Sequence, residues 1–169
     1  MSKTTIKLAR AGVIAGLYCL LSLITLPISG GAIQFRLSEG LNLLPILFPE
    51  AIPALFIGCL LFNFLSGLAF YDVVLGSVIT LVSAVCVYLV GKAIKNDFVS
   101  ALICGIFPIL LNAFGLPLIW LYLCDGLACA YWLQVVFLII SQSVSIYLVG
   151  IPTHLYLKRL KDKKIKYFE

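Results

Sequence analysis

Charged side chains are scarce in this chain, since Asp, Glu, Lys and Arg make up only 11% of its 169 residues. Soluble domains carry about 25% charged residues, so this composition excludes an ordinary water-soluble domain. Hydrophobic residues make up 63% and the mean hydropathy is +1.15, which predicts an all-α integral membrane protein. With a rise of about 1.5 Å per helical residue, the chain can cross a membrane about six times. We therefore expect a single transmembrane domain over residues 1–169.

Sets of residues that could support catalysis or bind a metal are also missing. His154 is the only histidine, and no Ser/His/Asp set, His pair or phosphate-binding glycine loop can be assembled. The six cysteines are scattered among apolar neighbours without a CxxC pair. We expect no catalytic residue, no metal and no cofactor. Two alternatives stay open: an intramembrane enzyme, which would need facing His or acidic residues, and a structural scaffold, which would bind no ligand.

Positive charge is concentrated near the two ends of the chain and around Lys92 and Lys95, with a net charge of +5. Because short cytoplasmic loops of membrane proteins are rich in Lys and Arg, we interpret these residues as cytoplasmic flanks rather than a nucleic-acid site. Six crossings place every Lys and Arg except Arg36 on one side. This arrangement predicts that both termini are cytoplasmic.

Prolines, glycines and polar turns divide the apolar sequence into six segments. Pro45, Pro49 and Pro53 interrupt the second apolar stretch, so we divide it at Glu50. The predicted helices are Leu8–Ile28, Glu39–Phe48, Ala51–Phe70, Asp72–Val90, Phe98–Leu118 and Tyr131–Leu157.

Several polar residues fall inside these spans or at their outer ends, where an idle ionisable group costs roughly 2.5 to 3.5 kcal/mol. They are Arg36, Glu39, Asn63, Asp72, Asn112 and Gln142. We expect the carboxylates and amides to line one pocket for a ligand with a planar donor and acceptor edge, such as a purine-like base. The alternatives are a structural Arg36–Glu39 ion pair and amides that only bridge neighbouring helices.

The first predicted helix carries small residues one turn apart, including Ala11 with Ala15 and Gly12 with Gly16. Such a stripe allows another helix to approach closely. Spacing alone favours internal packing, and a partner subunit is the alternative.

Several motifs are distinctive when taken together: Gln34-Phe35-Arg36-Leu37-Ser38-Glu39, the run from Ala51 to Cys59, Asp72-Val73-Val74-Leu75-Gly76-Ser77, Tyr131-Trp132 and Gly150-Ile151-Pro152. With these motifs the chain resembles the QueT family of membrane proteins. The resemblance covers nearly the whole chain and implies a substrate-binding S component of an energy-coupling factor (ECF) transporter, with six helices and no catalysis of its own. It also implies a transmembrane coupling subunit, two cytoplasmic ATPases, and residence in a prokaryotic cell membrane.

The resemblance further implies a queuosine precursor as substrate, such as 7-aminomethyl-7-deazaguanine, its nitrile precursor or queuine. Glu39 is then expected to accept paired N–H donors of the base, and Asp72 to pair with a ligand ammonium. Asn63 and Asn112 are expected to read the carbonyl or ring nitrogens, and Tyr131 or Trp132 to stack on the base. In S components the first helix docks on the coupling subunit, which favours the partner role of Ala11 and Ala15. An S component for a different vitamin or nucleobase is the alternative.

One position departs from the family pattern. The last predicted helix has Gln142 where the pattern has the Glu of a Gly-Glu pair. A neutral amide in the pocket would favour a neutral precursor such as queuine or the nitrile. If the position lies outside the pocket, it has no bearing on the substrate.

Overall fold

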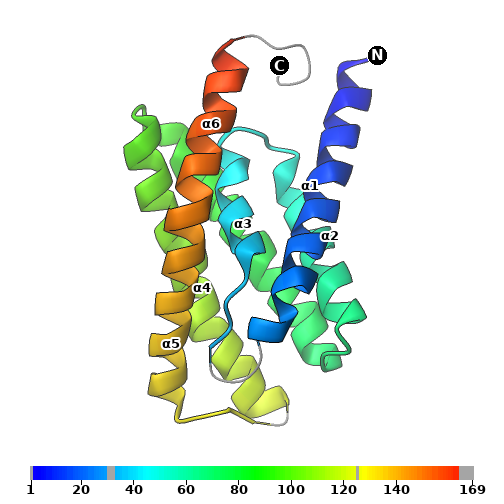
Figure 1. Cartoon of the computed structure of the whole chain (residues 1–169), viewed down its shortest axis with the longest axis vertical. Helices are drawn as coiled ribbons and strands as arrows, with labels where there is room; N and C mark the ends of the chain where they lie inside the picture. Colours follow the sequence, from blue (N-terminus) through cyan, green and yellow to red (C-terminus); the bar gives the residue numbers. More distant parts are fainter. Residues whose placement is uncertain (1, 30–32, 125, 164–169) are drawn as a thin grey trace.

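A computed structural model describes residues 2–29, 33–124 and 126–163. These residues fold into a bundle of helices in which α1 begins and α6 ends at the same end of the molecule (Figure 1). The elements, in chain order, are α1 (Lys3–Thr25), η1 (Leu26–Ile28), η2 (Leu37–Ile46), α2 (Ala51–Leu65), η3 (Asp72–Gly76), α3 (Ser77–Ala93), α4 (Asp97–Leu123), α5 (Tyr131–Ser143), η4 (Val144–Gly150) and α6 (Ile151–Asp162). No strand occurs among the residues described.

Four helices in the described ranges are long and apolar enough to cross a membrane. They are Lys3–Ile28, Asp72–Ala93, Asp97–Leu123 and Tyr131–Asp162. The helix Ala51–Leu65 is apolar but has only 15 residues, fewer than the roughly 20 that a span needs. The structure is therefore that of an all-helical, multi-pass membrane protein. Six crossings and the orientation of the termini stay predictions.

The second apolar stretch differs most from its sequence prediction. Instead of an α-helix over Glu39–Phe48, the chain forms η2, a 3₁₀-helix of ten residues. Runs of 3₁₀-helix longer than three or four residues are uncommon, because their hydrogen bonds are poorly aligned. Pro45, which lacks an N–H, lies inside η2. The predicted division near Glu50 is confirmed, because α2 begins at Ala51.

The last predicted helix is continuous but not uniform. The residues of α5, η4 and α6 form one rod along the molecule (Figure 1), with a π-helical segment at Val144–Gly150. At this segment the rod makes a close backbone contact with η2, since a Cβ built on Gly150 would lie 2.7 Å from the Gly40 carbonyl oxygen. Glycine is required at this crossing because no side chain fits.

A polar cluster holds the end of the bundle that contains the start of α1. Arg10 and Glu50 form an ion pair of 2.7 Å, and the Arg10 Cζ lies 4.3 Å from the Phe48 ring centroid. The Lys161 ammonium donates to the Leu47 carbonyl oxygen at 2.7 Å. These contacts tie the turn after η2 to α1 and α6.

Candidate functional site

All of the predicted polar residues except Gln142 converge on one small cavity, and Glu39 is its central group. Glu39 is only 2% exposed. The Tyr18 hydroxyl donates to its Oε1 at 2.8 Å, and the Asn42 and Asn112 amides donate to its Oε2 at 2.6 and 3.1 Å. Hydrogen bonds to a charged acceptor are stronger than neutral ones and offset part of the cost of burying a carboxylate.

Five of the eight substrate-binding residues expected from the sequence line this cavity. The full lining comprises Arg36, Glu39, Cys59, Asn63, Asp72, Gly76, Thr80, Asn112 and Leu116. Its residues come from η2, α2, η3, α3 and α4, so segments distant in sequence meet here. Gly76 keeps the space open, because a Cβ at this position would lie 3.3 Å from Asp72 Oδ1 and 3.5 Å from Asn63 Nδ2.

Arg36 and Glu39 share the cavity without pairing directly. Among the described residues no ion pair joins them within 4.0 Å, so the structural ion pair considered from the sequence is not formed. The Arg36 guanidinium instead lies with its Cζ 4.9 Å from the Phe62 ring centroid, and its Nη2 donates to Gln34 at 3.2 Å. A cation over an aromatic face is attracted by the ring quadrupole.

Hydrogen-bonding groups around the cavity are left without partners. Within the described part of the chain, Arg36 Nε and Asn63 Oδ1 are buried and make no hydrogen bond. An unsatisfied buried donor or acceptor costs roughly 1 to 3 kcal/mol. The two atoms offer one donor and one acceptor to a group entering the cavity.

The cavity is closed down to about 10 Å³, which accommodates a single water molecule at most. Asp72 is shared with a neighbouring vestibule of about 250 Å³, whose lining is Gln34, Leu68, Ala69, Asp72, Trp120, Cys124, Gly126, Ala128 and Gln134. Trp120 and Asp72 both line the vestibule. Asp72 also lines the cavity, so it lies where the two spaces meet.

Three predicted site residues lie away from the cavity lining. Trp132 is 70% exposed and stacks edge-on against Tyr131, whose hydroxyl donates to the Phe114 carbonyl oxygen. Gln142 is buried but lines neither the cavity nor the vestibule. The departure from the family pattern at Gln142 therefore leaves the charge of the cavity unchanged.

The sequence interpretation missed three residues at this site, namely Tyr18, Asn42 and Trp120. Trp120 follows Asn112 at twice the four-residue spacing of one helix face, with Leu116 between them, and this pattern is visible in the sequence. Asn42 follows Glu39 by three residues in the predicted helix Glu39–Phe48, so its place on the same face is also visible in the sequence. Nothing in the sequence around Tyr18 indicates its partner.

Ala11 and Ala15 lie on the inner face of α1. Ala15 is 8% exposed, and a Cβ built on Gly58 of α2 would lie 2.8 Å from the Ala15 carbonyl oxygen. Ala11 is half-buried and packs against the cluster of buried apolar residues that includes Ala15. Internal packing is thus one role of this pair, and its partner role stays a prediction.

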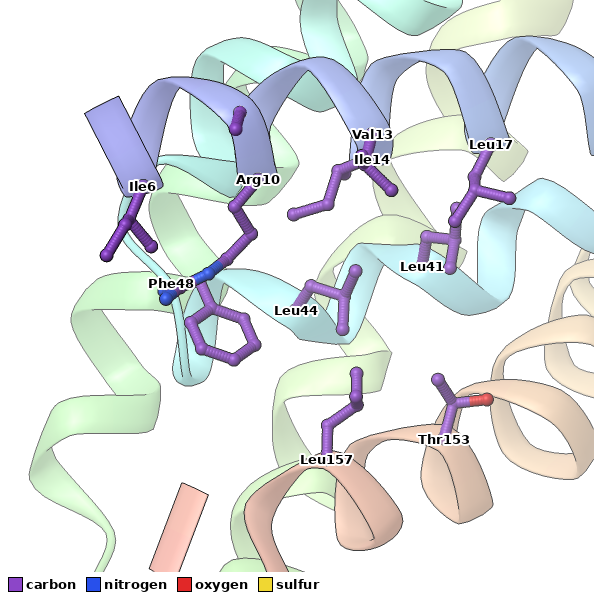
Figure 2. A pocket seen from close by; sticks show the side chains of 11 residues that line it. Ile6, Arg10, Val13, Ile14, Leu17, Leu41, Leu44, Phe48, Thr153 and Leu157 are labelled. Atoms are coloured by element: carbon purple, nitrogen blue, oxygen red, sulfur yellow. The ribbon is translucent and has the colours of Figure 1, made fainter. Parts of the chain in front are cut away.

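A large apolar groove runs along the other side of η2, between α1 and α6 (Figure 2). It encloses about 440 Å³ and is lined by Ile6, Ala9, Arg10, Val13, Ile14, Leu17, Leu41, Leu44, Phe48, Thr153 and Leu157. In Figure 2 the η2 side chains Leu41 and Leu44 lie between α1 and the α6 residue Leu157. Both the groove and the polar cavity thus take part of their lining from η2.

Comparison with known proteins gives one match. The family described as the QueT transporter matches residues 8–159. No curated protein and no solved structure matched the chain. The matched range includes every residue of the cavity lining and all four membrane-spanning candidates except their outermost residues. A multi-pass helical bundle with a buried polar cavity and a family match over most of its length leads to one conclusion: the chain belongs to the QueT transporter family.

Proposed function

We propose that this protein is the substrate-binding S component of an ECF importer and that it takes up a queuosine precursor with a 7-deazaguanine base. The observation that carries this proposal is the buried Glu39 carboxylate, held by three donors at the edge of a cavity that also contains Arg36 and Asp72. An importer subunit that binds its substrate needs such a site, and it needs no catalytic group.

The hydrogen-bonding groups match the edge of a guanine-like base. Such an edge carries adjacent N–H donors, which a carboxylate accepts in pairs, beside a carbonyl oxygen, which a guanidinium can bind. We assign the N–H donors to Glu39 and the carbonyl to Arg36, whose Nε has no partner among the described residues. Asn63 and Asn112 are assigned to the remaining ring positions. We assign stacking on the base to Trp120, which lines the vestibule, whereas Tyr131 and Trp132 line neither the vestibule nor the cavity.

The charges of the cavity favour a cationic precursor. Glu39 and Asp72 contribute two carboxylates, whereas Arg36 is the only cation in the lining. A ligand with one ammonium group would balance the remaining negative charge. Among queuosine precursors this favours those with a protonated amine, whose ammonium would lie near Asp72, over the neutral nitrile. 7-Aminomethyl-7-deazaguanine carries a primary amine and queuine a secondary amine, so queuine is not the neutral ligand expected from the sequence.

Binding requires the closed site to open. A cavity of about 10 Å³ cannot hold a base, since ligand pockets generally measure roughly 300 to 1,000 Å³. The vestibule of about 250 Å³ that meets the cavity at Asp72 provides the entry. We propose that a ligand enters there, past Trp120 and Asp72, which both line the vestibule.

The apolar groove is proposed as the surface for the coupling subunit. It is lined by α1 and α6, and Val13 beside it is 60% exposed. An apolar helix of a membrane partner would fill the groove by van der Waals packing, the main source of helix association in a bilayer. Ala11 and Ala15 would act here by setting the position of α1. Two cytoplasmic ATPases would supply the energy, because this chain presents no nucleotide-binding motif.

The membrane orientation follows from the same proposal. The protein would reside in the plasma membrane of a prokaryote, with both termini and most Lys and Arg residues on the cytoplasmic side. The contact of 3.6 Å between Lys158 and Asp97 supports this, because it joins the end of α6 to the start of α4. The cavity would then open toward the outside through the vestibule.

Calorimetric titration of the purified protein in detergent tests the substrate. The ligands are 7-aminomethyl-7-deazaguanine, its nitrile precursor, queuine, and guanine as a control. We expect tight binding of the aminomethyl compound, weaker binding of the neutral nitrile and none of guanine. If a folded protein binds none of the four ligands, the result would contradict the queuosine assignment and favour an S component for another vitamin or nucleobase.

A further inference from the structure

The Glu39 carboxylate is held from two sides. Tyr18 and Asn42 hold it from residues that do not line the cavity, whereas Asn112 belongs to the lining. Tyr18 and Asn42 are both fully buried. The bond from Asn42 is the shortest of the three at 2.6 Å, and the bond from Asn112 is the longest at 3.1 Å. The two amides therefore differ in their access to a ligand.

The helical type of η2 places Asn42 beside Glu39. In a 3₁₀-helix, side chains three residues apart are eclipsed, whereas in an α-helix they are offset by about 60° around the axis. Glu39 and Asn42 are three residues apart in η2. The eclipsed arrangement allows the Asn42 amide to reach the carboxylate of its own helix.

The number of acceptor positions limits what a ligand can do. A carboxylate offers about four lone-pair sites, two on each oxygen. Tyr18 occupies one site on Oε1, while Asn42 and Asn112 occupy both sites on Oε2. A ligand that donates to both oxygens must therefore displace one amide from Oε2.

We propose that Asn42 is a positioning residue of the substrate site, which keeps the Glu39 carboxylate oriented while Asn112 is exchanged for a ligand N–H donor. This rests on the proposed function, since it assumes a ligand with paired donors. Asn112 is the group that leaves, because it lines the cavity and makes the longer bond. Tyr18 assists Asn42 by fixing the other oxygen. Recognition of paired donors then depends on a residue that does not touch the ligand.

The test compares 7-aminomethyl-7-deazaguanine with its analogue that lacks the 2-amino group, because only the first offers two adjacent donors. Calorimetry gives the affinity ratio of the two ligands for the wild-type protein and for Asn42→Ala. Hydrogen bonds to charged groups contribute more than those between neutral groups. We therefore expect Asn42→Ala to weaken the first ligand about tenfold or more, to weaken the analogue much less, and so to bring the ratio close to one.

Two further variants separate positioning from folding. Tyr18→Phe removes one hydroxyl and keeps the ring, so it should lower the ratio in the same direction by a smaller factor. Ser145→Ala alters a buried residue whose carbonyl contacts the opposite side of η2 at Gly40, and it should leave the ratio unchanged. Melting temperatures show whether each variant is folded.

The outcomes distinguish this proposal from the proposed function. If the wild-type protein binds neither ligand, both the queuosine assignment and the positioning role of Asn42 are rejected. If it binds the first ligand but Asn42→Ala and Tyr18→Phe weaken both ligands equally, the ratio is preserved. The queuosine assignment then stands, and the positioning role is rejected in favour of a structural one.

Discussion

The polar cavity and the apolar groove have η2 in common and differ in every other respect. The cavity measures about 10 Å³ and contains two carboxylates, a guanidinium and two amides. The groove measures about 440 Å³ and is lined by apolar side chains except for Arg10 and Thr153. The cavity has polar groups that could select a solute but is too small to hold one. The groove is large enough, but its apolar lining offers few groups that could select a solute. Cavity volume is therefore a poor guide to the binding site in this protein, because the polar groups that could select a solute line the smaller of the two spaces.

The difference also shows how the two surfaces would be used. Polar groups without partners gain from a ligand that completes their hydrogen bonds, and this gain requires that water be excluded. An apolar groove facing lipid gains only from shape complementarity. We therefore expect substitutions in the cavity to change ligand affinity alone, and substitutions in the groove to change subunit assembly alone.

The largest expected effect is on ligand affinity at Glu39. Glu39→Gln replaces one acceptor oxygen by a donor while preserving volume, so calorimetry should show an affinity for 7-aminomethyl-7-deazaguanine reduced by more than tenfold. Glu50→Gln is the matched control, because Glu50 is also a largely buried carboxylate but pairs with Arg10 away from the cavity. An unchanged affinity in Glu39→Gln would remove Glu39 from the site.

The groove should respond in assembly rather than in ligand binding. Val13→Trp fills the groove with a large ring, and we expect about a tenfold loss of co-purified coupling subunit when all subunits are co-expressed. Ligand affinity should change by less than about twofold. Leu102→Trp on α4 is the control, since Leu102 is 44% exposed and lies outside the groove lining. Equal assembly of both variants would place the coupling surface elsewhere.

Asp72 should discriminate between precursors by charge. Asp72→Asn removes one of the two carboxylates, so the affinity for the aminomethyl precursor should fall about fivefold, which corresponds to roughly 1 kcal/mol. The neutral nitrile precursor should bind with nearly unchanged affinity. A parallel loss for both ligands would show that Asp72 does not recognise the ammonium group.

The smallest effect concerns the backbone contact that holds η2. Gly150→Ala places a Cβ 2.7 Å from the Gly40 carbonyl oxygen, and the resulting strain of about 1 to 3 kcal/mol should lower the melting temperature in detergent by several degrees. Gly12→Ala is the control, because a Cβ added at Gly12 would meet nothing within 4 Å. Equal melting temperatures would mean that η2 and η4 separate easily.

Much of this architecture follows from hydrophobic patterning. The sequence predicts, within a few residues, the helical segments that begin at Ala51, Asp72, Asp97 and Tyr131, because prolines and polar turns mark their starts. It also predicts the residues of the cavity that carry charge or an amide, because idle polar groups are costly at membrane depth. Each such residue can be identified from the sequence without knowing which other residues it contacts.

The remainder depends on three-dimensional contacts that have no local signal. The predicted helix Ala51–Phe70 is wrong at its end, since α2 stops at Leu65 and a positive φ follows at Gly67. The 3₁₀ form of η2 has no local signal, because an apolar run with proline does not specify helix type. The resemblance to the family leads to Tyr131 or Trp132 for stacking, whereas Trp120 lines the vestibule.

The three-residue period of η2 has a consequence for how this segment can vary. Glu39 and Asn42 lie on one face of η2, Leu41 and Leu44 line the groove, and Gly40 meets η4. In a helix with three residues per turn, inserting or deleting one residue rotates all later positions by about 120°. The change would move Asn42 out of reach of Glu39 and a polar side chain into the groove. The contacts on its three faces therefore constrain the number of residues in η2 as well as their identity.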